Sequence, residues 1–357
     1  MIPVTKSFIP PIEEYNSWLE KVWDSGWLTN RGSLVKLLED KINAYLDTDF
    51  VIAMTNGTLP IQIAIKALDV KGDVITTPFS YVATTSTIFW EGCNPIFVDI
   101  DPNYFTIDET KIEAAITEET TAILATHVYG NPCNVEAIEA IAEKHNLSVI
   151  YDAAHCFGVK YKGQSLFDYG DVSTSSFHAT KLFHTGEGGA LFCKPHLRDK
   201  MYFHHNFGHK GQEAFHGLGI NAKMSEIQAA MGLSVMPYLD EIIEKRKTIT
   251  SLYSELLADA SLTLISIREG TQWNYSYFPV VFESEAQLTR VKDALNKNEI
   301  YPRRYFFPSL NKLPYIKESF NCPVSESIAS RVLCLPLYTQ LSKAEVETIC
   351  SIINETI

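Results

Sequence analysis

Lys181 lies in a segment that could carry out covalent chemistry on a carbonyl compound. An apolar, strand-like run, 172–177, precedes it, and the glycine-rich turn 186–189 leads into a second apolar run, 190–193. This pattern predicts a lysine on a short loop between two buried strands. A buried ammonium is costly unless it is paired or neutral, and a desolvated lysine is a nucleophile toward carbonyls. The segment predicts a lysine that holds pyridoxal phosphate as a Schiff base, although a loop lysine that reaches back to water explains it equally well.

Other polar residues follow predicted strands and could complete such a site. Asn56-Gly57-Thr58 opens a helix whose free N–H groups could bind a phosphate. The ring of Tyr81 could stack on a flat cofactor, and Asp152 could keep a pyridine nitrogen protonated. His155 could touch the same cofactor. Each residue also has a structural explanation: a helix or turn cap for Asn56-Gly57-Thr58 and Asp152, a core ring for Tyr81, and a satisfied histidine.

Strand-like and helical runs alternate along the first half of the chain. The expected strands are 50–54, 74–77, 96–100, 122–128, 148–151, 172–177 and 190–193, and the expected helices are 59–68, 82–90 and 135–145. This alternation predicts the α/β class, with a mostly parallel sheet covered by helices on both faces. In such sheets ligands bind beyond the carboxyl ends of the strands, where the residues described above lie.

The two ends of the chain have other patterns. Residues 13–46 predict two amphipathic helices split by Gly26–Gly32, with Ser33 as a cap of the second. From residue 236 the alternation weakens, and a long helix over 239–257, strands over 262–267 and 277–282, and a helix over 285–297 are expected. Ser342 and Glu345 predict a capping box for the last helix. We expect a large domain at 1–235 and a small α+β domain at 236–357.

Two local motifs do not fit the sites that they first suggest. The turn 186–189 has neither the lysine of a phosphate-binding P-loop nor the glycine spacing of a dinucleotide site, and it predicts a tight turn. The predicted loop after residue 195 is rich in histidine, but its spacing does not fit a compact set of metal ligands. Its histidines are His204, His205, His209 and His216.

Composition narrows the function further. The 357 residues carry a formal charge of −13, so nonspecific binding to nucleic acid or to an anionic membrane is not expected. An anionic substrate would need a local basic pocket, for which Arg303 and Arg304 are candidates unless they form a solvated pair. The seven cysteines form no C-x-x-C pair, which favours a reducing compartment. We expect a cytoplasmic protein, because no signal peptide or membrane-spanning run is present.

Seven segments, in one order along the chain, resemble the DegT/DnrJ/EryC1/StrS family of pyridoxal-phosphate-dependent aminotransferases, which act on nucleotide-linked keto-sugars. These segments are 26–29, 56–58, 78–84, 151–155, 176–181, 186–189 and 219–228. The resemblance implies the type I aminotransferase fold and a homodimer with a shared active site.

The resemblance also implies individual roles for residues of the site. Lys181 would bind the aldehyde of the cofactor, Asp152 its pyridine nitrogen, and Tyr81 would lie over its ring. The residues implied to hold the phosphate are Gly57, Thr58, Ser176 and, from the neighbouring subunit, Asn221.

Three positions depart from the pattern of the family. Many members have Gln where this chain has His155, Arg where it has Lys223, and His where it has Asn311. Contacts to the sugar nucleotide are expected from Thr29, Arg303 and Tyr305.

Segments 2–6, 152–155 and 176–181 look most like members that make 4-amino-4,6-dideoxyglucose on dTDP. The expected reaction transfers the amino group of L-glutamate to C4 of dTDP-4-dehydro-6-deoxy-D-glucose. Members that aminate C3 look similar in these segments, so a 3-keto-sugar aminotransferase is one alternative. A dehydratase on the same scaffold would have histidine in place of Lys181. A regulator that binds a nucleotide sugar without catalysis would need no such lysine.

Overall fold

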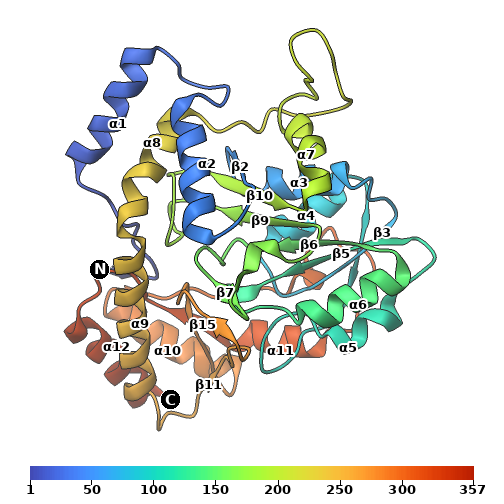
Figure 1. Cartoon of the computed structure of the whole chain (residues 1–357). Helices are drawn as coiled ribbons and strands as arrows, with labels where there is room; N and C mark the ends of the chain where they lie inside the picture. Colours follow the sequence, from blue (N-terminus) through green and yellow to red (C-terminus); the bar gives the residue numbers. More distant parts are fainter.

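The computed structural model describes residues 1–357. Its largest sheet has seven strands and lies at the centre, with helices around it (Figure 1). The five strands from β9 to β4 run parallel, whereas β10 is antiparallel to both of its neighbours. The prediction of a mostly parallel sheet is confirmed. From one edge to the other the order is β2 (Ile52–Met54), β10 (Gly189–Cys193), β9 (Val172–Ser176), β6 (Ser148–Asp152), β5 (Thr120–Thr126), β3 (Asp73–Thr76) and β4 (Asn94–Phe97).

Both faces of this sheet are buried. Successive side chains of each strand point to opposite faces, so each strand contributes to two apolar cores. In β5, Ile123 belongs to one apolar core and Leu124 to the other. Helices α1, α2, α6 and α8 contribute to the first core, and α3, α4 and α7 to the second. The helices of this part are α1 (Ile12–Ser25), α2 (Ser33–Leu46), α3 (Leu59–Ala67), α4 (Val82–Trp90), α5 (Glu109–Ile112), α6 (Val135–His145), α7 (Arg198–His205) and α8 (Glu226–Val235).

The C-terminal part has its own apolar core around a small antiparallel sheet in the order β11-β13-β15. The chain begins and ends in this part, beside α9 and α12 (Figure 1). The longest helix of this part is α9, and the capping box of Ser342 and Glu345 is present as predicted. The elements are α9 (Leu239–Leu256), β11 (Thr263–Leu264), β13 (Phe278–Val281), α10 (Glu285–Lys297), α11 (Pro323–Arg331), β15 (Val332–Leu335) and α12 (Lys343–Thr356).

Two further small sheets join distant segments. The N-terminal strand β1 (Ile2–Pro3) pairs in parallel with β14 (Ile300–Tyr301). A three-stranded sheet contains β12 (Thr271–Gln272), β7 (Lys160–Tyr161) and β8 (Gln164–Ser165). No helix combines the length and the apolar character that crossing a bilayer requires.

Two sequence predictions about helices are wrong. Ser33 does not cap α2, because Gly32 occupies that position, and the carboxylate of Glu226 accepts hydrogen bonds from the N–H groups of Leu34 and Val35 instead. The segment after residue 195 is not all loop: α7 ends at His205. The first error has a tertiary cause, since the acceptor comes from a helix far away in sequence.

Candidate active site

Lys181 lies on the loop between β9 and β10, as the sequence predicts. Hydrogen bonds inside the loop fix its path: Lys181 N–H donates to the carbonyl of His178 (2.8 Å), and Ala179 N–H donates to that of Gly186 (2.7 Å). Gly186 has a φ of 80°, which a glycine adopts without strain. The hydroxyl of Ser7 donates to the carbonyl of Ala179 (2.6 Å), so the N-terminal segment crosses the loop. The backbone around the lysine is therefore held from two sides.

The amine of Lys181 points into a partly enclosed pocket. Its Nζ lies 3.3 Å from the hydroxyl oxygen of Tyr277, to which it donates. Burial lowers the pKa of Lys181, and the nearby negative charge of Asp152 partly opposes this effect. A lowered pKa leaves more of the amine neutral at neutral pH, and the neutral amine is the nucleophile. The pocket is lined by Ala154, His155, Phe157, Ser176, Thr180, Lys181, Leu182, Ser276 and Tyr277.

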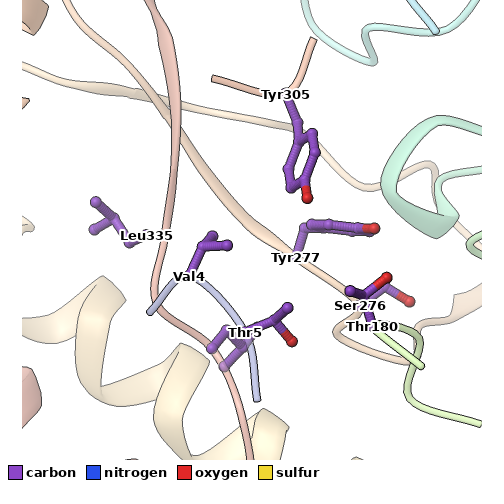
Figure 2. A pocket seen from close by; sticks show the side chains of 8 residues that line it. Val4, Thr5, Thr180, Ser276, Tyr277, Tyr305 and Leu335 are labelled. Carbon is purple, nitrogen blue, oxygen red and sulfur yellow. The ribbon is translucent and has the colours of Figure 1, made fainter. Parts of the chain in front are cut away.

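A second small pocket adjoins the first, and the C-terminal part contributes most of its lining. Figure 2 shows the rings of Tyr277 and Tyr305 beside each other, with Ser276 and Thr180 below them. The two tyrosine rings are 5.6 Å apart in a T-shaped arrangement. Val4 and Thr5 of the N-terminal segment close another side (Figure 2). Tyr305, a predicted substrate contact, therefore lies close to the lysine.

Asp152 is the last residue of β6 and is 5% exposed. Its Oδ2 accepts a hydrogen bond from the hydroxyl of Thr84 (2.6 Å), and its Oδ1 accepts one from Ala154 N–H (3.2 Å). Burial raises the pKa of Asp152, whereas these two donors and the charge of Lys181 favour the carboxylate. A buried acceptor with fixed donors can pair with one further cationic or protonated nitrogen.

His155 is also buried, and its orientation fixes its protonation. Its Nδ1 accepts a hydrogen bond from Tyr129 N–H (3.1 Å), so the proton of the neutral ring is on Nε2. The ring lies parallel to that of Phe306, at 5.8 Å and 3°. Burial and the charge of Lys181 hold the pKa of His155 well below its ordinary value. His155 thus offers a neutral N–H donor, as the amide of a glutamine would.

Gly57, Thr58 and Ser176 come together where α3 begins beside the end of β9. A Cβ at Gly57 would lie 2.7 Å from that of Ser176, so only glycine fits. The N–H of Gly57 and the hydroxyls of Thr58 and Ser176 donate no hydrogen bond within the chain. These donors lie near the N-terminus of a helix, where an anion is stabilised. These three residues thus supply free N–H and O–H donors of the kind that bind a phosphate group.

The glycines of the turn 186–189 let the backbone pass close to the Asn56–Thr58 loop, as the sequence predicts. A Cβ at Gly189 would lie 2.3 Å from the carbonyl oxygen of Asn56, so the glycine allows β10 to pass close to that loop. The side chain of Asn56 in turn accepts hydrogen bonds from the N–H groups of Thr58 (2.9 Å) and Leu59 (3.0 Å).

The remaining predicted residues lie at the rim of the site or away from it. Tyr81 is exposed directly before α4, near enough to Lys181 to affect its pKa. Arg303 is exposed and lies over the ring of Tyr305, 5.1 Å from its centroid. Asn221 is exposed and accepts a hydrogen bond from the amine of Lys223 (2.6 Å). Thr29 lies on the exposed loop between α1 and α2. Neither Thr29 nor Asn221 hydrogen bonds to residues around Lys181 of the same chain.

Arg304 does not form a basic pair with its neighbour. It makes an ion pair with Glu285 (2.8 Å) and donates to the carbonyl of Ser330 (2.8 Å), so it joins α10 to α11. Both alternatives for this pair, a joint anion site and a solvated pair, are wrong for Arg304. Only Arg303 stays available to an anionic ligand.

Sequence reasoning missed two residues of the site, Tyr277 and Thr84. Tyr277 precedes a strand of the C-terminal part, 96 positions from Lys181, and its neighbours carry no motif that predicts this contact. Thr84 lies within a segment that was recognised, 78–84, and a hydroxyl in the first turn of a helix near a predicted site is the signal that could have found it.

The hydroxyl of Tyr277 offers a direct test of the pocket geometry. Replacing Tyr277 by Phe should lower kcat/KM about fivefold, because the neutral amine of Lys181 then loses its side-chain hydrogen-bond partner, worth about 1 kcal/mol. Steady-state kinetics would measure the change. Tyr275→Phe, two positions away, is the control and should leave kcat/KM unchanged. Equal rates for Tyr277→Phe and the unmodified protein would contradict a role for this contact.

Known proteins are similar to this chain over almost its whole length. The family model described as DegT/DnrJ/EryC1/StrS aminotransferase family matches residues 12–354. The chain is 42% identical over 359 residues to the dTDP-4-amino-4,6-dideoxy-D-glucose transaminase of Shigella dysenteriae, and the match covers 99% of this chain and 98% of that protein. A transaminase of the same name from Escherichia coli is 39% identical over 356 residues, covering 96% and 95% of the two chains.

A solved structure has the same fold. It is the crystal structure of DesI in the presence of its TDP-sugar product, which superposes with a TM-score of 0.94 at 30% identity. The superposition covers 99% of this chain and 92% of that one.

Proposed function

Since the chain belongs to the DegT/DnrJ/EryC1/StrS aminotransferase family, we propose that it transfers the amino group of L-glutamate to C4 of dTDP-4-dehydro-6-deoxy-D-glucose. The products are dTDP-4-amino-4,6-dideoxy-D-glucose and 2-oxoglutarate. The two transaminases from Shigella dysenteriae and Escherichia coli, matched over nearly their full length, support this substrate. The single observation that carries the chemistry is the amine of Lys181 in a pocket that His155 also lines, with the carboxylate of Asp152 near enough to act on the pKa of the lysine.

Pyridoxal 5′-phosphate is the cofactor that we propose for this site. Bound there, it would act as an electron sink that stabilises negative charge on the carbon bearing the amino group. Lys181 would hold its aldehyde, and Asp152 its pyridine nitrogen. The free donors of Gly57, Thr58 and Ser176 would hold the phosphate.

His155 and Tyr81 complete the proposed cofactor site. The Nε2–H of His155 is a fixed neutral donor, so it can take the place of the glutamine amide of other members. Tyr81 is exposed directly before α4, and its ring would cover the cofactor ring.

Lys181 would also move protons during the reaction. In the first half, its neutral amine would remove the proton from Cα of glutamate, which a positioned base does far more effectively than water. In the second half, it would return a proton to C4 of the sugar. Its lowered pKa suits both steps, since the same nitrogen must accept and release a proton near neutral pH.

The active unit that we propose is a homodimer. In one chain the side chain of Asn221 bonds to the amine of Lys223 and to no residue of the Lys181 pocket. Asn221 lies between α7 and α8, in a segment whose loop projects from the body (Figure 1). This segment exposes four large apolar side chains, which a partner would cover. They are Phe207, Phe215, Leu218 and Ile220.

The test of the proposed function is product analysis. The protein, with pyridoxal phosphate and L-glutamate, would be given dTDP-4-dehydro-6-deoxy-D-glucose in one reaction and its 3-keto isomer in another. We expect turnover of the first, with ring NMR placing the new amine on C4. A C3 amine would show that the chain is a 3-keto-sugar aminotransferase. Tight binding of both sugars without turnover would favour the non-catalytic regulator and contradict the proposal.

A further inference from the structure

Three buried hydroxyls form a continuous hydrogen-bonded chain that ends on Asp152. Thr84 Oγ1 lies 2.6 Å from Asp152 Oδ2. Ser80 Oγ lies 2.7 Å from Thr84 Oγ1, and Thr126 Oγ1 lies 2.9 Å from Ser80 Oγ. All four side chains are at most 5% exposed. Water therefore has little access to any link of the chain.

The fold brings these hydroxyls together from the end of β5 and from the segment that follows β3. Thr126 is the last residue of β5 and pairs in register with Asp152 at the end of β6. Ser80 lies between β3 and α4, and Thr84 lies in the first turn of α4. Because β6, β5 and β3 are parallel neighbours, their carboxyl ends meet at one edge of the sheet. The hydroxyl chain thus ends on Asp152, which is hydrogen-bonded to Ala154 in the lining of the pocket that contains Lys181.

The ionised carboxylate of Asp152 determines which oxygen donates in each hydrogen bond of the hydroxyl chain. An ionised carboxylate can only accept, so the hydroxyl proton of Thr84 points to Asp152. Ser80 must then donate to Thr84, and Thr126 must donate to Ser80. All three O–H dipoles point the same way, toward the carboxylate. Hydrogen bonds aligned in this manner polarise and strengthen one another.

We propose that Thr84, Ser80 and Thr126 are positioning residues that hold Asp152 ionised and aimed at the pyridine nitrogen of the cofactor. This inference rests on the proposed function and deepens it, since it concerns how one residue of that site is set up. Thr84 fixes Oδ2 and Ala154 N–H fixes Oδ1, so the carboxylate plane cannot rotate freely. Besides Lys181, the titratable groups that act electrostatically with Asp152 include Cys156, whose thiol is buried and neutral.

The experiment compares two ligands with full-length protein stripped of cofactor. One ligand is pyridoxal phosphate, and the other is its deaza analogue, in which C–H replaces the ring nitrogen. Both have the same aldehyde and phosphate. The ratio of their dissociation constants therefore measures how much the interaction of the protein with the ring nitrogen contributes to binding. The unmodified protein should prefer pyridoxal phosphate, and Asp152→Asn should lose that preference.

Variants of the hydroxyl chain should change this ratio without changing the affinity for the analogue. We expect Thr84→Val, which keeps the shape and removes the hydroxyl, to weaken binding of pyridoxal phosphate about tenfold. Ser80→Ala should weaken binding of pyridoxal phosphate about threefold, because Ser80 is one hydrogen bond further from Asp152 than Thr84 is. Thr84→Ser should restore the affinity of the unmodified protein. Thr85→Val is the matched control, because the hydroxyl of Thr85 is buried beside Thr84 but has no partner.

The outcomes separate this inference from the proposed function. An equal loss for both ligands in Thr84→Val, or no loss, would overturn the role of the hydroxyl chain while Asp152→Asn behaves as expected. If the unmodified protein showed no preference for pyridoxal phosphate over the analogue, the proposed role of Asp152 would itself be wrong. Should Thr84→Val fail to fold by circular dichroism, Ser80→Ala decides the question by the same ratio.

Discussion

Lys181→Ala should lower the rate of transamination by about 10⁴-fold or more, because it removes both the covalent attachment point and the proton carrier. The fold should survive the change. Burial lowers the pKa of Lys181 in the folded protein, so its ammonium form is favoured in the unfolded chain. Unfolding of the cofactor-free protein is therefore promoted by this lysine at any pH below its unfolded pKa, about 10.4. The alanine variant should be at least as stable near neutral pH, and its advantage should disappear as the pH rises toward that value.

Two measurements check this expectation. Single-turnover kinetics with glutamate give the rate, and borohydride reduction of the loaded protein followed by peptide mapping gives the site of attachment. In the unmodified protein the label should be on the peptide with Lys181, and in the variant it should be absent. Lys194→Ala, which removes a partly exposed lysine paired with Asp171 (3.1 Å), is the control. A label on another lysine, or full activity of Lys181→Ala, would contradict the assignment of Lys181 as the residue that holds the cofactor.

Asp152→Asn should lower the rate of the glutamate half-reaction by about 200- to 5,000-fold. The amide is the same size and can still accept the hydrogen bond of Thr84, but it cannot neutralise a protonated pyridine nitrogen. Loss of one partner from a buried charge pair costs about 3–5 kcal/mol, and each 1.36 kcal/mol corresponds to a factor of ten in rate. Because Asp152 is 5% exposed, solvent cannot replace the missing charge.

Stopped-flow absorbance of the bound cofactor after mixing with glutamate measures this rate. Asp108→Asn is the matched control, because Asp108 caps α5 outside the Lys181 pocket and asparagine caps a helix equally well. The control should retain the rate of the unmodified protein. If Asp152→Asn reacted as fast as that protein, Asp152 would not be the partner of the ring nitrogen.

Local sequence patterns were sufficient wherever the deciding interactions are local. Helices α4, α6 and α10 have the predicted bounds, because their apolar spacing and caps lie within the helix or directly beside it. The position of Lys181 between two strands could be predicted for the same reason. The order of strands and helices then placed Asp152 at the carboxyl edge of the sheet, near that lysine.

Contacts between distant segments could not be predicted in this way. The carboxylate that accepts from the first N–H groups of α2 belongs to Glu226, and the partner of the Lys181 amine is Tyr277, from the C-terminal part. Arg304 is occupied by Glu285, which no spacing rule indicates. Each of these depends on which side chains the packing brings within about 3 Å, and that distance is set by the whole fold.

By itself, the sequence determined the α/β class, the parallel strands and the lysine loop, because hydrophobic periodicity and turn residues act over a few positions along the chain. Only the tertiary structure decided how that lysine and Asp152 are solvated and bonded. Burial lowers the pKa of Lys181 and raises the pKa of Asp152. A chain of hydroxyls from β5, the β3–α4 loop and α4 favours the carboxylate form of Asp152. Desolvation and hydrogen-bond direction depend on every neighbour in three dimensions.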